Sequence, residues 1–77
     1  MRDKLSEQAV KKLAEELLKL RKAKGYSHQT LAELAGVTRP AISYIETHKR
    51  VPSLLTCLKL AKALDVRLTD LLNKIEK

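Results

Sequence analysis

Residues 26–50 constrain the fold of this chain more than any other segment. The stretch YSHQTLAELAGVTRPAISYIETHKR contains two short helical patterns that meet at Gly36. Each pattern follows a hydroxyl residue, Ser27 or Thr38. Such residues are preferred helix N-caps, because the side-chain oxygen accepts a hydrogen bond from the first turn. Glycine takes the left-handed conformation of a tight turn at little cost. The stretch therefore predicts two short helices joined by a turn.

The apolar periodicity of the remaining chain predicts three further helices, and no strand pattern competes with them. In the first helix, Val10, Leu13, Leu17 and Leu20 recur on one face, and Gly25 follows a basic last turn, as is usual at a helix C-terminus. The expected helices cover about residues 3–24, 28–35, 39–47, 54–64 and 69–75. The predicted fold class is therefore all-α, with five helices.

The second, third and fourth helices are expected to turn one apolar stripe inward. The stripes are Leu31, Leu34 and Ala35 in the second helix, Ile42 and Ile45 in the third, and Leu54, Leu58, Ala61 and Leu64 in the fourth. The fifth helix has the apolar residues Leu71, Leu72 and Ile75. Ser53 and Thr69 are the expected N-caps of the last two helices.

Length and charge bound the class of protein. The chain has 77 residues, and 16 Lys and Arg against 9 Asp and Glu give a formal charge of +7. This length predicts one domain over residues 1–77. The charge suits a polyanionic partner, but charge alone does not separate nucleic acid from an anionic membrane or from a merely basic surface.

Several classes of protein are disfavoured by what the sequence lacks. The one cysteine cannot form an intrachain disulfide, and no signal peptide opens the chain, so we expect a cytoplasmic protein. No apolar run approaches the roughly 20 residues that span a bilayer. His28, His48 and Cys57 do not fall at metal-ligand spacings. No phosphate-binding glycine loop or nucleophile–base pair is present, so we expect no enzyme activity, no cofactor and no small-molecule substrate.

One run of fixed residues from Arg21 to Leu54 carries a family pattern. The run R-x-x-x-G-x-S-x-x-x-L-A-x-x-x-G-V-T-x-x-x-I-S-x-I-E-x-x-K-R-x-P-S-L resembles the Cro/repressor-type (Xre-like) helix-turn-helix family, and the tail from Leu58 to Val66 continues the match. The resemblance implies a DNA-binding transcriptional regulator that reads a palindromic operator in double-stranded DNA as a homodimer. The helix at 39–47 would be the recognition helix in the major groove.

The resemblance also assigns site residues by position. The base-contacting candidates are Arg39, Pro40, Ser43 and Tyr44. The phosphate-contacting candidates are Ser27, His28, Thr47, Lys49 and Arg50. Four of these residues have a simpler alternative: Arg39, Lys49 and Arg50 could be solvated charges, and Tyr44 could pack on the turn. Arg21 and Glu46 are better explained as a structural ion pair, since a carboxylate beside DNA is otherwise unfavourable.

This chain departs from the family pattern at four positions. His28 replaces a common Gln, and Pro40 replaces a polar residue that could read a base. His48 and Asp65 stand where glycine is usual. If the backbone is left-handed at the latter two, a residue other than glycine carries a modest strain.

The dimer contact and the biological role are left more open. The last helix and its preceding loop hold Val66, Leu68, Leu72 and Ile75. These are more apolar residues than we expect so short a helix to bury within its own fold, so these four are the expected dimer interface. Three roles fit equally: a phage-type repressor, a restriction–modification controller, or an antitoxin that represses its own operon. The competing class is a protein-interaction module whose main partner is another protein, such as a toxin.

Overall fold

The computed structural model describes residues 4–76, with side chains from residue 7 onward, and contains five helices and no strand within that range. The helices are α1 (Lys4–Lys24), α2 (His28–Ala35), α3 (Arg39–Glu46), α4 (Leu54–Ala63) and α5 (Leu68–Ile75). The predicted all-α fold class is confirmed. Residue 3, where we expected the first helix to begin, lies outside the described residues.

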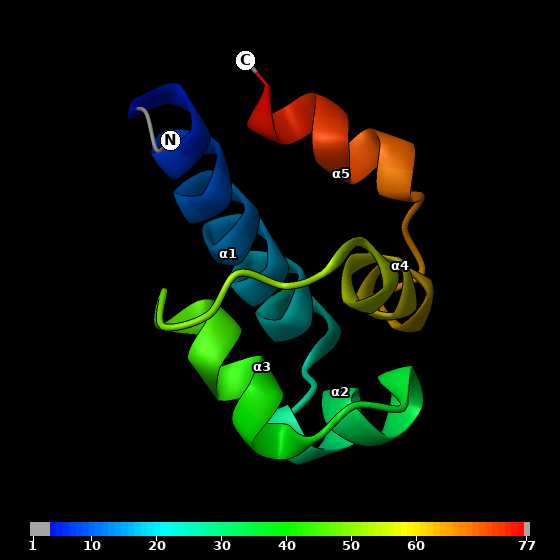
Figure 1. Ribbon diagram of the computed structural model, residues 1–77. Helices are drawn as coiled ribbons and strands as arrows, with labels where there is room; N and C mark the ends of the chain where they lie inside the picture. The colour runs from blue at the N-terminus through cyan, green and yellow to red at the C-terminus, as the bar shows by residue number, and fades with distance from the viewer. Residues whose placement is uncertain (1–3, 77) are drawn as a thin grey trace.

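The helices form two groups with α4 between them (Figure 1). The long helix α1 lies beside α5 at one end of the molecule, and α2 packs against α3 at the other end. Helix α4 contacts both α2 and α5, while α1 also contacts α3. This arrangement leaves one side of the α2–α3 pair without a covering helix among the described residues.

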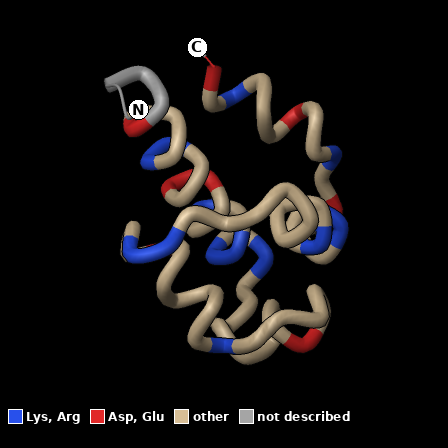
Figure 2. The backbone as a smooth tube through the Cα atoms, in the orientation of Figure 1, with Lys and Arg blue, Asp and Glu red and all other residues tan. Residues whose placement is uncertain are grey.

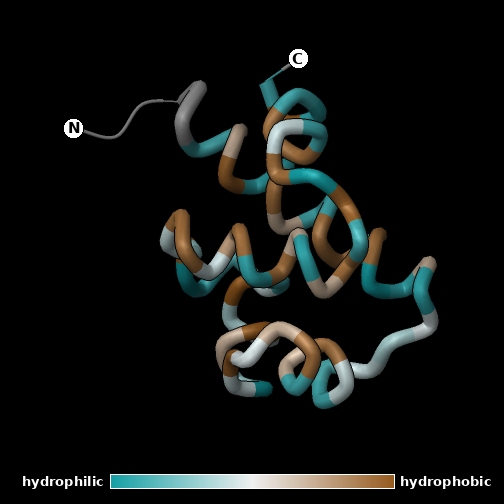
Figure 3. Tube along the Cα trace, turned by 90° about the vertical axis from the view of Figure 1, so that its right-hand side faces the viewer, coloured by the Kyte–Doolittle hydropathy of each residue, from teal (hydrophilic) through white to brown (hydrophobic). Residues whose placement is uncertain are grey.

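All five helices contribute to one hydrophobic core. Six large side chains are almost completely buried: Leu17, Leu31, Ile42, Leu60, Leu64 and Leu71. Burying each such side chain contributes about 1.5–3 kcal/mol. Hydrophobic residues recur along the helices in Figure 3. Their spacing gives each helix an apolar stripe, which packs against the shared core.

The starts of α2, α3 and α4 follow from local sequence. The side-chain oxygens of Ser27, Thr38 and Ser53 accept hydrogen bonds from the backbone N–H groups three residues later, at 3.0, 3.2 and 3.1 Å. Such caps are worth about 1 kcal/mol each. Pro40 lies in the first turn of α3, where its missing N–H leaves no helical hydrogen bond unmade.

The predicted start of the fifth helix is wrong. We expected Thr69 as its N-cap, but α5 begins at Leu68 and its N-cap is Arg67, whose side chain makes no capping bond. Val66 and Leu68 pack against the core on either side of Arg67. Their burial fixes the chain there, and this outweighs the roughly 1 kcal/mol that a hydroxyl cap would supply.

The predicted inward faces of α2 and α4 are partly wrong. Leu34, Leu54 and Leu58 are 56%, 71% and 44% exposed. Helix α2 instead buries Leu31, Ala32 and Ala35, and α4 with its C-cap buries Cys57, Leu60, Ala61 and Leu64. Both helices carry more apolar residues than one stripe can hold, so several stripes have helical spacing and the position of neighbouring helices decides between them.

Four residues adopt left-handed backbone conformations. Gly25 and Gly36 have φ values of 74° and 72°, while His48 and Asp65 both have φ of 64°. His48 and Asp65, which stand where the family usually has glycine, are therefore left-handed. Each carries the steric cost of a Cβ atom in the left-handed region.

Replacing His48 with glycine should stabilise the protein. Glycine removes the Cβ that disfavours φ of 64°, so after its own entropy cost the free energy of unfolding should rise by roughly 0.5–1 kcal/mol. Chemical denaturation measures the change. His48→Ala keeps the Cβ and is the matched control. An equal gain in the alanine variant would show that backbone strain is not the cause.

Candidate nucleic-acid interface

The turn between α2 and α3 fixes the two helices as a rigid pair. Gly36 is the left-handed C-cap of α2, and its N–H and that of Val37 both donate to the carbonyl of Ala32. Leu31 of α2 and Ile45 of α3 then enter the shared core. With its apolar stripe buried, α3 must turn its polar residues outward.

The four predicted base-contacting residues lie together on that outer face. Arg39, Pro40, Ser43 and Tyr44 line a shallow hollow of about 240 Å³, which His28 closes from the start of α2. Arg39 and Pro40 are exposed, and Tyr44 is 42% exposed. The outer face of α3 therefore places a cation, an aromatic ring and a hydroxyl around this one hollow.

The predicted phosphate-contacting residues surround this face, but two of their hydroxyls already donate locally. Ser27 Oγ donates to Thr30 Oγ1 at 3.0 Å, and Thr47 Oγ1 donates to the carbonyl of Ser43 at 2.7 Å. Lys49 and Arg50 are exposed in the loop after α3. Figure 2 shows basic positions both at the start of α3 and in this loop.

A contact between Arg50 and Tyr44 is a feature that our sequence reasoning missed. The guanidinium carbon of Arg50 lies 5.4 Å from the centre of the Tyr44 ring, within cation–π range. The backbone N–H groups of Lys49 and Arg50 also both donate to the carbonyl of Tyr44, at 2.8 and 3.2 Å. The basic loop is thus held against the outer face of α3. Only the tight turn at His48 brings these residues together, and sequence spacing gave no sign of it.

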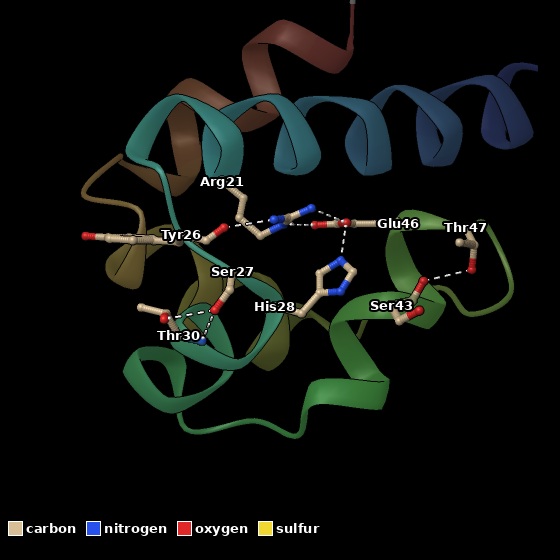
Figure 4. A network of polar contacts seen from close by, with 8 residues as sticks. All are labelled: Arg21, Tyr26, Ser27, His28, Thr30, Ser43, Glu46 and Thr47. Carbon is tan, nitrogen blue, oxygen red and sulfur yellow. Dashed lines mark hydrogen bonds and ion pairs between the residues drawn. The ribbon is translucent and has the colours of Figure 1, made fainter.

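Arg21 and Glu46, the expected ion pair, are in direct contact beneath this face (Figure 4). Arg21 Nε donates to Glu46 Oε2 at 2.7 Å, and Nη2 donates to Oε1 at 3.0 Å. The other guanidinium nitrogen, Nη1, donates to the carbonyl of Tyr26 at 2.8 Å. The two side chains are only 11% and 7% exposed. One guanidinium therefore connects α1 to α3 and to the segment leading into α2.

His28 is a third member of this network, which the sequence did not indicate. Its Nε2 lies 2.8 Å from Glu46 Oε1. Burial is the largest single influence on Glu46 and raises its pKa. The hydrogen bonds and positive charges of Arg21 and His28 together outweigh burial, so the pKa of Glu46 lies below its ordinary value of 4.5. Glu46 is therefore ionised at neutral pH and holds α1, α2 and α3 together.

The residues expected at a dimer interface mostly serve the core. Val66, Leu68 and Ile75 are partly buried against it, and only Leu72 is exposed, at 38%. Three of the four apolar residues that we expected to be in excess on the last helix and its preceding loop are therefore packed against the core. A different exposed apolar group lies at the start of α4 and in the loop before it: Val51, Leu54, Leu55 and Leu58.

The lone cysteine is part of the core. Cys57 is 6% exposed, and burial raises the pKa of its thiol. No group of three or more His, Cys, Asp or Glu side chains that could hold a metal ion is found among the described residues. None of the helices in the described part of the chain is long and apolar enough to cross a membrane.

Residues 17–71 match the family model described as helix-turn-helix. The chain belongs to the Cro/repressor-type (Xre-like) helix-turn-helix family. This family consists of DNA-binding regulators of transcription and is not a class of enzymes. Its matched residues include the whole α2–α3 pair and both members of the Arg21–Glu46 contact.

Three curated relatives come from Bacillus subtilis, and two of them differ in how much of their length this chain covers. The uncharacterised helix-turn-helix regulator YgzD is 45% identical over 51 residues, which are 66% of this chain and 77% of the relative. The prophage-derived regulator YonR is 43% identical over 60 residues, which are 78% of this chain and 55% of the relative. The chain therefore spans most of one helix-turn-helix relative but only about half of the other.

Two solved helix-turn-helix structures have the same fold. The restriction-modification controller protein C.AhdI from Aeromonas hydrophila is 42% identical with a TM-score of 0.76, covering 80% of this chain and 94% of its own. SinR, a master regulator for biofilm formation solved in complex with DNA, is 38% identical with a TM-score of 0.73, covering 78% of this chain and 97% of its own.

Replacing Glu46 with glutamine should destabilise the protein most at neutral pH. The change leaves Arg21 without a counter-charge, and we expect a loss of roughly 2–3 kcal/mol, somewhat below the range for a fully buried pair. Because folding lowers the pKa of Glu46, its ionised form stabilises the folded state fully above pH 4.5, and this contribution disappears as the pH falls through the lower folded value.

Thermal unfolding over a series of pH values measures this effect. The difference in Tm between wild type and Glu46→Gln should shrink as the pH falls below 4.5. Glu33→Gln, at an exposed carboxylate of α2, is the control and should change Tm little at any pH. A Glu46→Gln deficit that stayed constant down to the acid limit would contradict a role for the charge.

Proposed function

We propose that this protein is a sequence-specific transcriptional regulator that binds a palindromic operator as a homodimer. Helix α3 enters the major groove with its first turn toward the base edges, while α2 lies across the backbone. One observation carries the proposal: Arg39, Pro40, Ser43 and Tyr44 surround one hollow on an outward face of α3 whose opposite side is locked into the core.

The outer face divides into base-reading and backbone-contacting residues. Arg39 has two parallel donors that suit guanine O6 and N7. Pro40 and Tyr44 offer apolar surface to a thymine methyl, and Ser43 offers a hydroxyl. Lys49 and Arg50 neutralise phosphates beyond the end of α3. Ser27, His28 and Thr47 complete the backbone contacts. As a DNA-binding regulator, the protein acts in the cytoplasm.

Among the three biological roles, the similarity to C.AhdI favours a restriction–modification controller. This chain covers 94% of that controller's chain at 42% identity. The DNA-bound state of SinR, which has the same fold, supports the docking of α3 in DNA. Neither similarity specifies an operator, so the sequence that this protein reads must be selected experimentally.

We further propose that two copies associate through the apolar group at the start of α4. Val51, Leu54, Leu55 and Leu58 are 44–71% exposed, and a cluster of this kind on a small protein marks an interaction surface. A second copy is the occupant that a palindromic operator requires, since its two half-sites need two recognition helices about 34 Å apart. The group adjoins the loop that follows α3, so a two-fold contact there would set the spacing of those helices directly.

Arg39→Ala and Lys49→Ala should affect DNA binding in different ways. The operator is first obtained by selecting bound duplexes from a random pool with the purified protein. Arg39→Ala should then relax the preference at one base pair of each half-site, a loss of about 1–3 kcal/mol in discrimination. Lys49→Ala should weaken binding to all DNA sequences about equally. It should also make the slope of log affinity against log salt concentration shallower, by the equivalent of about one phosphate contact per subunit.

Binding measured against a panel of operator variants in rising salt tests this division of roles. If the two variants behave alike, the division is wrong. If the random pool yields no enriched sequence and the wild-type affinity for duplex DNA is negligible, sequence-specific regulation is excluded, and a protein-interaction module becomes the better explanation.

Charged substitutions should distinguish the two candidate dimer surfaces. Leu55→Lys, at a 61% exposed position of α4, should leave the fold intact and convert dimer to monomer, because two added cations would face each other across the two-fold axis. Leu72→Lys on α5 is the matched variant. Sedimentation at tens of micromolar protein measures both. Dissociation by Leu72→Lys alone would place the contact on α5 as the sequence predicts, and a monomeric wild type would refute the dimer.

A further inference from the structure

The two ring nitrogens of His28 face different surroundings (Figure 4). Nε2 points at Glu46 Oε1, 2.8 Å away. Nδ1 lies on the opposite edge of the ring and points away from Glu46. Within the described part of the chain, no hydrogen-bond partner is found for Nδ1. The His28 side chain is 31% exposed, so one edge of the ring is engaged and the other is available.

The charge of Glu46 decides where the proton of a neutral His28 ring resides. Glu46 also accepts two hydrogen bonds from Arg21, and its lowered pKa keeps it ionised. A carboxylate is an acceptor only, so Nε2 must carry a proton and donate it. In the neutral ring, Nδ1 then has a lone pair and no proton. Only the imidazolium carries a proton on both nitrogens.

The available edge belongs to the DNA-facing surface. His28 lines the same hollow as Arg39, Ser43 and Tyr44, and it is the first residue of α2, the helix expected to cross the DNA backbone. A phosphate oxygen is an acceptor, as is the Nδ1 lone pair of the neutral ring, so the two would repel. Protonated Nδ1 would instead donate a charge-assisted hydrogen bond to the phosphate.

We propose that His28 binds a DNA backbone phosphate through Nδ1–H as an imidazolium, so that each subunit takes up a proton at this residue when it binds DNA. The proposal rests on the DNA-binding function proposed above and specifies the chemistry of one contact. Because coupling between two ligands is reciprocal, DNA raises the proton affinity of His28 and protonation raises the affinity for DNA.

The groups around the ring act in opposite directions. On α3, the Glu46 carboxylate attracts a positively charged ring, whereas the Arg39 guanidinium in the same hollow repels it. On α1, Arg21 shares the carboxylate of Glu46 and disfavours a second positive charge there. Since Arg21 already balances the charge of Glu46, a DNA phosphate would add a second negative charge to pair with the imidazolium.

The experiment compares the pH dependence of DNA affinity in three proteins. Fluorescence anisotropy with a labelled mixed-sequence duplex reports backbone contacts without knowledge of the operator. Wild-type affinity should fall about tenfold from about pH 5.5 to about pH 8, the range in which histidine side chains titrate. His28→Gln should bind with nearly constant affinity over this range, because an amide donates a proton at any pH.

His48→Asn is the matched control. His48 is the other of the two histidines, and asparagine tolerates its left-handed backbone. This variant should keep the wild-type pH dependence. Calorimetry in buffers of different ionisation enthalpy adds a second measurement: wild type and His48→Asn should take up protons on binding, and His28→Gln should not.

The outcomes separate this proposal from the proposed function. If wild-type affinity for the duplex is the same at both ends of the range, or if His28→Gln keeps the pH dependence and the proton uptake, the role of His28 is refuted while DNA binding stands. If the wild type binds duplex DNA at neither pH, the DNA-binding function itself fails. Equal Tm values for wild type and His28→Gln would show that unfolding does not cause the difference.

Discussion

The contact between Arg21 and Glu46 is the constraint on which the outer face of α3, our proposed DNA-binding surface, depends. Glu46 is the last residue of α3 and nearly buried, and its carboxylate accepts two bonds from α1 and contacts His28 of α2. A buried charge is costly unless it is paired and hydrogen-bonded. Glu46 therefore holds three helices in one relative position, because a rearrangement that separated them would leave a buried charge without its partner.

The same network lies directly beneath the surface that would read DNA. The buried stripe of α3 and the polar network fix its inner side, while Arg39, Pro40, Ser43 and Tyr44 remain on its outer side. Rigid placement matters for base reading, since two-donor contacts depend on geometry. His28 belongs to both the network and the surface, so under our proposal the protonation of its ring would link the interior to the DNA backbone.

The left-handed turns have a comparable effect on the connections. Gly36 lets α2 and α3 pack closely, and His48 turns the chain so that the basic loop returns to Tyr44. That return brings Arg50 over the Tyr44 ring. The strain at His48 is modest, and it is offset by the backbone hydrogen bonds that the turn allows.

The sequence by itself determined the existence of the helices and the starts of α2, α3 and α4. Ser27, Thr38 and Ser53 cap helices through bonds spanning three residues, and Gly25 and Gly36 supply left-handed backbone. These are short-range effects, and the sequence contains all the atoms involved. The family pattern added the Arg21–Glu46 pair and the residues now found around one hollow, which spacing alone would not have joined.

Only the tertiary structure decided which apolar residues are buried and which polar groups meet. Leu54 and Leu58 have the same helical spacing as Leu60 and Leu64, yet only the latter pair faces the core. Thr69 is a residue type that suits a helix N-cap, but α5 begins earlier, at Leu68, because Val66 and Leu68 pack against the core. The contact of His28 with Glu46 joins residues 18 positions apart. Such choices depend on where neighbouring helices pack, and that position is a property of the whole chain and not of any one segment.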